Sequence, residues 1–230
     1  MKSEQGYATP VVLGFISVMS LVAVWAFNLA LAQNREVQAR QQLLLLQLSF
    51  SSIVQEQIFQ VLDRPDSVQL GTRHLSVAGV NVVAELSNER SRPNFRYSNA
   101  EQLRDDLLRL LPSDANVDRL ISVRRSWRGD EAPDSLEELV GNLDLSAQIA
   151  ACLTENFTVY ASTVDPLASG YFSRNAAGAI LRINVKTLPA ETPSLRIRAI
   201  VLFTGNVEQP FEIFEWVEDQ QTQNPSCASE

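Results

Sequence analysis

The chain has 230 residues, 45% of them hydrophobic, and a formal net charge of −8. This length allows one or two domains, and the acidic balance argues against binding to nucleic acid or to anionic lipid, which both need a basic face. The acidic surplus lies after residue 34, because Lys2 offsets Glu4 and the segment from Tyr7 to Asn34 contains no Asp, Glu, Lys or Arg.

The uncharged segment from Tyr7 to Asn34 predicts a membrane anchor. A helix of about 20 apolar residues crosses a bilayer core, whereas a secretory signal peptide has an apolar core of only about 7 to 15 residues. Ala30-Leu31-Ala32 loosely matches a signal-peptide cleavage site, so removal of the whole segment is the lesser alternative. The orientation stays open at this point, because only Lys2 precedes the span and Arg35 and Arg40 follow it.

An amphipathic stretch follows the anchor without a break. Neither proline nor glycine occurs from Phe15 to Arg64, and apolar residues recur at steps of three and four, including Leu43, Leu46, Phe50, Ile58 and Val61. The anchor and this stretch therefore predict one continuous helix of about 56 residues, roughly 84 Å long, whose apolar stripe packs on the chain's own domain. Pro65 ends it, because proline lacks the amide hydrogen and disfavours helix in the residue before it.

After Pro65 the pattern changes to short strands and short helices. Strands are predicted at His74 to Leu86, Phe157 to Thr163, Ala179 to Lys186, Leu195 to Thr204 and Phe211 to Val217. In the third of these, Arg182 and Asn184 alternate with apolar residues, which predicts a half-buried strand with one apolar face. Helical spacing occurs at Ala100 to Leu111, Val117 to Val123, Ser135 to Val140 and Ser146 to Glu155, with Asn99 and Asp134 as N-caps and a capping box from Ser135 to Glu138. The expected fold class is α+β: a long N-terminal helix packed on an antiparallel sheet, with an inserted small α-helical subdomain.

The sequence offers no catalytic motif. It contains no H-E-x-x-H, no phosphate-binding glycine loop and no G-x-S-x-G, and the single histidine, His74, is interpreted as structural. The acidic run from Asp130 to Glu138 contains oxygen ligands of the kind that hard cations bind, but it is interpreted as a solvated face. No enzymatic activity, cofactor or metal site is therefore predicted, and Trp127, Phe214 and Trp216 are candidates for either a binding surface or the core.

The junction at Gly6-Tyr7 resembles the processing site of the type IV pilin and pseudopilin superfamily. In that superfamily a prepilin peptidase cuts after the glycine and the new amino terminus is methylated, so the resemblance implies cleavage between Gly6 and Tyr7 and N-methylation of Tyr7. Pro10 would then be the fourth residue of the mature helix, where a backbone N–H has no intrahelical partner. Val11 stands where most pilins carry a glutamate, and the known exception in the superfamily is protein K of the type II (general) secretion pathway.

Further motifs resemble the protein K family in the same order along nearly the whole chain. Asn88 to Phe95 occupies the place of an acidic D-E-x-G stretch, Ser126 to Asp130 resembles D-W-R-D, Ser135 to Leu139 resembles S-x-E-E-L, and Pro210 to Ile213 resembles the last strand. This chain is more compact than most of the family. Asn88, Ser91 and Ser126 stand where acidic or glycine residues are expected, so the calcium sites of the family are not predicted here.

The resemblance implies a minor pseudopilin at the tip of a periplasmic pseudopilus, which initiates or caps filament assembly for the export of folded proteins across the outer membrane. It implies a single-pass protein of the inner membrane with its C-terminal domain in the periplasm. The implied partners are minor pseudopilins I and J, the major pseudopilin, the inner-membrane assembly platform, the prepilin peptidase and secreted cargo. In an oxidising periplasm Cys152 and Cys227 can form a disulfide, and two reduced thiols are the alternative.

The expected boundaries follow from these elements. They are 1–6 for the leader, 7–34 for the transmembrane half of the helix, 35–64 for its amphipathic half, 65–98 for the first part of the pilin-like domain, 99–156 for the inserted helical subdomain, 157–219 for the rest of the sheet and 220–230 for a flexible tail. Two other functions stay open: a minor pilin of a type IV pilus, and a single-pass binding or sensor protein that never joins a filament.

Overall fold

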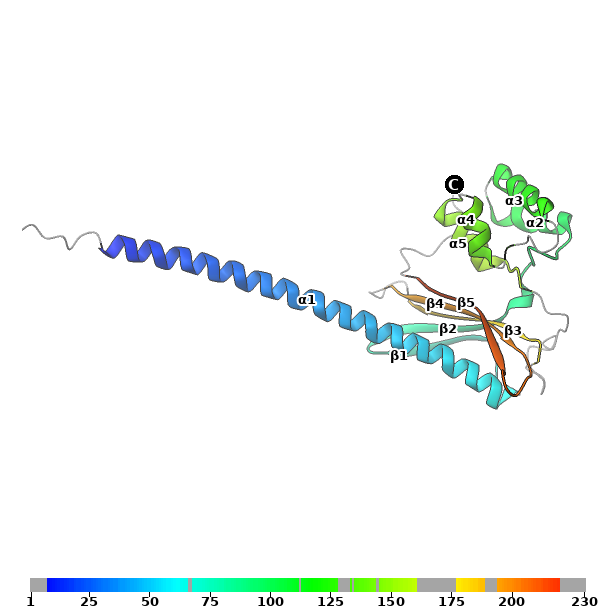
Figure 1. Cartoon of the computed structure of the whole chain (residues 1–230), viewed down its shortest axis with the longest axis horizontal. Helices are drawn as coiled ribbons and strands as arrows, with labels where there is room; N and C mark the ends of the chain where they lie inside the picture. The colour runs from blue at the N-terminus through cyan, green and yellow to red at the C-terminus, as the bar shows by residue number, and fades with distance from the viewer. Residues whose placement is uncertain are drawn as a thin grey trace, which may run out of the picture. The chain divides into compact units, whose positions relative to one another are not determined.

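The computed structural model describes residues 8–65, 68–111, 113–127, 133, 135–143, 145–160, 177–188 and 194–219. Two compact units divide the chain, Met1–Gln47 and Leu48–Glu230. The fold class is α+β, as the sequence predicted: a long apolar N-terminal helix and a five-stranded antiparallel sheet, with four further helices between the second and third strands (Figure 1).

The long helix α1 runs without interruption from Ala8 to Asp63, which is 56 residues. Pro10 lies in its first turn, where the missing N–H has no intrahelical partner to lose. At the other end the Arg64 N–H still donates to the Gln60 carbonyl at 3.0 Å, and Pro65 ends the series of helical hydrogen bonds. The predicted length and the predicted stop are both confirmed.

All strands of the sheet follow one another in space in the order β1-β2-β3-β4-β5, and each pair is antiparallel. Their bounds are β1 Gly71–Val77, β2 Val80–Asn88, β3 Ile180–Thr187, β4 Arg196–Phe203 and β5 Phe211–Asp219. The single run predicted from His74 to Leu86 is therefore two strands. Ala78 and Gly79, with φ of 50° and 81°, form the tight turn between them, since a two-residue hairpin turn with positive φ at both positions matches the twist of the strands.

The strand predicted from Phe157 to Thr163 is wrong in its described part. Residues 157–160 form no strand, and Thr158 makes only an isolated parallel bridge with Asn94. This bridge consists of hydrogen bonds from the Phe95 N–H to the Thr158 carbonyl at 2.7 Å and from the Thr158 N–H to the Pro93 carbonyl at 3.1 Å. Residues 161–163 lie outside the described part of the chain.

The two faces of the sheet differ sharply in polarity. One face is apolar and buried, and its residues in β3 and β4 are Leu181, Ile183, Val185, Ile197, Ala199 and Val201. This is the face against which α1 packs within the second unit, since the opposite face contacts other helices. There α1 buries Phe50, Val54, Ile58 and Val61, and the Gln60 side chain accepts a hydrogen bond from Arg73 of β1 at 3.4 Å. The predicted packing of the amphipathic stripe on its own domain is confirmed.

The opposite face carries arginines and is buried as well. Arg182, Asn184, Arg196 and Arg198 are only 1%, 2%, 8% and 4% exposed. The alternation in the sequence correctly separated the two faces, but the expectation that β3 is only half-buried is wrong. Antiparallel sheets commonly leave the polar face to solvent, whereas here helices cover it.

Four helices follow β2 and the short 3-10 helix η2 (Glu89–Ser91): α2 Ala100–Leu110, α3 Asp114–Ser126, α4 Leu136–Leu143 and α5 Ala147–Asn156. Asn99 caps α2 by accepting from the Glu101 N–H at 3.1 Å, and the Ser135 hydroxyl accepts from the Glu138 N–H at 3.1 Å, as the capping box predicts. The expected cap Asp134 lies outside the described residues. The helices share a buried apolar cluster that includes Phe95, Leu103, Leu107, Val117, Leu120, Leu139, Leu153 and Phe157.

Candidate functional site

The first candidate site is the apolar half of α1. Large apolar side chains on this part of the helix point to solvent, among them Leu21 at 70%, Trp25 at 67% and Phe27 at 64% exposed. Its most apolar window has a mean hydropathy of 2.1, and none of that window is buried. Among the described residues, α1 is the one helix long and apolar enough to span a membrane.

Two of the sites predicted from the sequence fall wholly or partly outside the described residues. Gly6 and Tyr7, the predicted cleavage and methylation site, precede the first described residue. Cys152 lies in α5 and is 1% exposed within the helical cluster, while Cys227 is not among the described residues. The disulfide between them therefore stays a prediction.

A buried arginine joins β3 to the end of α5. The Arg182 guanidinium holds both oxygens of Glu89 in η2, with Nε–Oε2 and Nη2–Oε1 distances of 2.6 Å. Its remaining N–H groups donate to carbonyls at the C-terminal end of α5: Thr154 at 2.6 Å, Glu155 at 3.2 Å and Phe157 at 3.2 Å. The five donors of the guanidinium thus meet five acceptors. Carbonyls in the last turn of a helix lack intrahelical partners, so Arg182 also acts as a cap for α5.

Two more arginines of β4 continue this layer of charge. Arg196 forms an ion pair with Glu155 of α5, and Arg198 forms one with Glu137 of α4. Arg198 also contacts Glu215 of β5 at 2.6 Å, and the Tyr160 hydroxyl donates to the other oxygen of Glu215 at 3.1 Å. We call these groups and the Arg182–Glu89 pair the charged layer.

Burial and neighbouring charges act on the charged layer in opposite directions. Burial raises the pKa of Glu155, but Arg196, Arg182 and Arg92 outweigh burial and hold that pKa below its ordinary value. Burial raises the pKa of Glu215 above its ordinary value, in spite of Arg198. Burial and the adjacent Glu215 also raise the pKa of Tyr160, which is therefore protonated at neutral pH.

The charged layer attaches helices to the sheet. Every carboxylate named in it is bound to an arginine. The arginines lie on two strands, β3 and β4, and the carboxylates lie on four other elements, η2, α4, α5 and β5. Buried ion pairs fix relative position because the loss of one partner leaves an uncompensated charge. The layer thus ties α4 and α5 to the polar face of the sheet.

Metal-binding geometry is not found in the part of the chain that the structure describes, where no three His, Cys, Asp or Glu residues gather. The acidic run expected to be a solvated face is not solvated throughout, because Glu137 is bound to Arg198. Asp130, Glu131 and Asp134 of that run lie outside the described residues. His74 is exposed in β1, opposite Val83 of β2.

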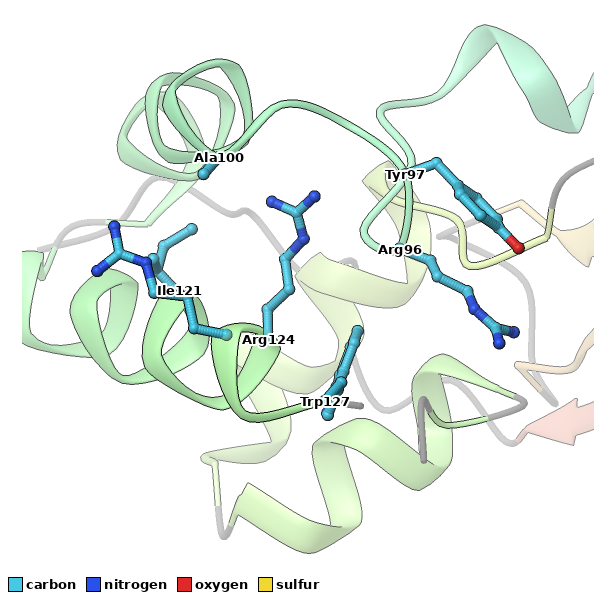
Figure 2. Close-up of a pocket in the computed structure, with 7 residues that line it drawn as sticks. Arg96, Tyr97, Ala100, Ile121, Arg124 and Trp127 are labelled. Atoms are coloured by element: carbon cyan, nitrogen blue, oxygen red, sulfur yellow. The ribbon is translucent and has the colours of Figure 1, made fainter. Parts of the chain in front are cut away.

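A second candidate site is a basic pocket beside α2 and α3, which has a volume of about 430 Å³. Its lining residues are Arg96, Tyr97, Ala100, Ile121, Arg124, Arg125 and Trp127. Figure 2 shows Arg124 extending from α3 into the space between Ala100 and the loop that carries Tyr97, with Trp127 beside it and Arg96 directed away. The Arg124 guanidinium donates to the Ser98 carbonyl, which holds this loop against α3.

None of the three aromatic candidates is fully buried, and Phe214 is 37% exposed. Trp127 lines the basic pocket and packs on Phe95, with ring centroids 5.8 Å apart. Phe214 stacks on Tyr160 at 5.2 Å, and Trp216 donates to Glu218 at 3.0 Å. Sequence reasoning missed Arg182 and its partners. The available signal was the polar and basic residues at every second position of two neighbouring strands, which are Arg182, Asn184 and Lys186 in β3 and Arg196 and Arg198 in β4.

No protein-family model matches the chain, and no curated protein or solved structure is significantly similar to it.

Proposed function

We propose that this chain is a minor pseudopilin of a type II protein secretion system, anchored in the inner membrane with its C-terminal domain in the periplasm. The observation that carries the proposal is α1: an uninterrupted helix of 56 residues that begins with an exposed apolar half and ends with a face buried on an antiparallel sheet. A subunit of a helical filament needs both halves. The apolar half holds it in the lipid before assembly and packs against similar helices afterwards.

Exposed apolar residues on the second half of α1 support this proposal. Leu48 is 66% exposed and Phe59 is 62% exposed, although the same helix buries Phe50 and Val54 on its opposite side. A single exposed apolar side chain needs no explanation, but apolar residues on both sides of one helix fit contact with neighbouring subunits.

The proposal places this subunit at the filament tip. Val11 lacks the carboxylate that pairs, in most pilins, with the amino terminus of a neighbouring subunit, and a tip subunit has no such neighbour above it. We also propose that α2 to α5 form an inserted subdomain that blocks further addition of subunits. The charged layer suits this role because buried arginines of β3 and β4 hold α4 and α5 on the sheet through ion pairs and hydrogen bonds.

Deletion of the gene, followed by complementation, tests the function. The proposal predicts that secretion of folded proteins across the outer membrane is lost and that twitching motility is retained. Loss of twitching with normal secretion would favour a type IV pilus, and the loss of neither would favour the sensor. Complementation with Val11→Glu or with a deletion of α2 to α5 tests capping, which predicts altered filament length or secretion.

A further inference from the structure

The basic pocket is unusual for a chain with a net charge of −8. None of its three guanidinium groups pairs with a carboxylate of the described residues. Arg124 contacts the Ser98 carbonyl, and the Arg96 guanidinium lies over the Tyr97 ring at 5.7 Å. By contrast, two arginines of neighbouring α2 do have carboxylate partners: Arg104 pairs with Asp118 at 2.8 Å and Arg109 with Asp106 at 3.9 Å.

The last turn of α3 explains only part of this arrangement. Cations in the last turn of a helix are stabilised by its dipole, which accounts for Arg124 and Arg125 without any ligand. It does not account for Arg96, which comes from the separate loop before α2 and lines the same cavity. The Arg96 guanidinium is directed away over the Tyr97 ring, so it adds positive charge at the rim of the cavity and not at its centre.

A second, independent observation comes from Arg90 in η2. Its Nε and Nη2 atoms are buried and have no acceptor among the described residues. Arg90 lines a neighbouring pocket of about 510 Å³, and this pocket shares Tyr97 with the basic pocket. A buried donor without an acceptor costs about 1–3 kcal/mol, which a bound acceptor removes. Asp106 also lines this second pocket, next to Arg109 of its own helix.

We propose that the two pockets form one binding site for an acidic segment of a partner protein. A carboxylate enters the basic pocket between Arg124 and Arg125, with Arg96 at the rim, and a second acceptor of the same segment reaches Arg90 across Tyr97. Guanidinium groups suit carboxylates because their planar forks donate two parallel hydrogen bonds. Ile121 and Trp127 offer apolar surface to a neighbouring side chain of the segment.

The size of the site and the charge of the chain favour a short acidic peptide segment over a long polyanion. A cavity of about 430 Å³ holds one or two side chains, and the net charge of −8 repels an extended nucleic acid. The inference goes beyond the proposed function and does not depend on it, because a filament subunit and a membrane-anchored sensor can both bind such a segment.

Isothermal titration calorimetry on the full-length protein in neutral detergent micelles tests the site. The probe is the peptide acetyl-Gly-Phe-Glu-Asp-Phe-Glu-Gly-amide, and the matched peptide carries Gln and Asn in place of Glu and Asp. We expect the acidic peptide to bind at least about tenfold more tightly, since charge-assisted hydrogen bonds are about twice as strong as neutral ones. Arg90→Gln, Arg96→Gln and Arg125→Gln should each weaken binding by about fivefold or more.

Arg119→Gln is the matched control. Arg119 is exposed on the same helix α3 and lies outside both pockets, so its loss should change the affinity by less than about twofold. Arg124 is left intact because its hydrogen bond holds the loop.

Four results would overturn the proposal. These are equal binding of the two peptides, equal effects of Arg119→Gln and the pocket variants, full displacement of the peptide by an equimolar amount of inorganic phosphate, and binding to phosphatidylglycerol vesicles without binding to the peptide.

Discussion

Arg182 offers the sharpest test of how the helices are held on the sheet. The substitution Arg182→Met keeps an unbranched side chain but removes all five donors. It leaves Glu89, which is 0% exposed, with Arg92 at 3.6 Å as its remaining cation, and it takes the Arg182 donor from three carbonyls, of which only that of Glu155 also accepts from Arg92. Removal of one partner from a buried ion pair costs about 3–5 kcal/mol. This is a large part of the roughly 5–15 kcal/mol that stabilises an average folded protein.

The double substitution Arg182→Met with Glu89→Leu separates the ion pair from the cap. It removes the buried charge that has lost its bidentate partner but leaves the Thr154 and Phe157 carbonyls without the Arg182 donor, so we expect it to be more stable than Arg182→Met alone by about 2 kcal/mol. The assay is urea unfolding of the full-length protein in neutral detergent, followed by tryptophan fluorescence. Arg109→Met, at a side chain that is 79% exposed, is the control and should change the stability by less than about 0.5 kcal/mol. Two results would contradict this prediction. One is an Arg182→Met variant with the same free energy of unfolding as the control, and the other is a double variant whose loss of stability equals the sum of the losses of Arg182→Met and Glu89→Leu measured singly.

Three further predictions concern the charged layer, the cysteines and the anchor. The folded pKa of Glu155 lies below the ordinary value of 4.5, so its ionised form stabilises the fold above that pH. The difference in stability between the native chain and Glu155→Gln should therefore shrink as the pH falls through the folded pKa. A difference that is constant down to pH 3 would contradict this. If Cys152 and Cys227 pair, denatured protein should take up alkylating reagent only after reduction, and the bond should stabilise the fold by about 4.5 kcal/mol according to the chain-entropy relation. Two thiols labelled before reduction would exclude the bond. Leu21→Arg places a charge in the apolar half of α1, which costs about 2.5–3.5 kcal/mol at the centre of a bilayer. Carbonate should therefore extract more of this variant from membranes than of the control Leu21→Ala. Equal retention of the two variants would argue against a membrane span.

The sequence predicted the long helix, the α+β class and the caps Asn99 and Ser135 because each depends on local rules. The spacing of apolar residues, the absence of charge and the positions of the prolines are enough to place α1 from Ala8 to Asp63. The hairpin turn at Ala78-Gly79 was missed because alanine seldom adopts a positive φ, so the run around it reads as a continuous strand.

The charged layer was missed for a different reason. The alternation in β3 shows that Arg182 and Asn184 share a face, but alternation alone does not tell whether water or a helix covers that face. The answer depends on Glu89, Glu137 and Glu155, which lie far away in the chain and come close only after folding. The basic pocket likewise combines a loop with the end of α3, and no local sequence pattern predicts it.

Mass spectrometry of the amino terminus of the protein purified from membranes tests the central claim most directly. The account predicts a mature chain that starts with N-methylated Tyr7, so that the apolar helix begins at the membrane surface and Pro10 lies in its first turn. An intact or formylated Met1, or a chain that starts just after Ala32, would contradict it.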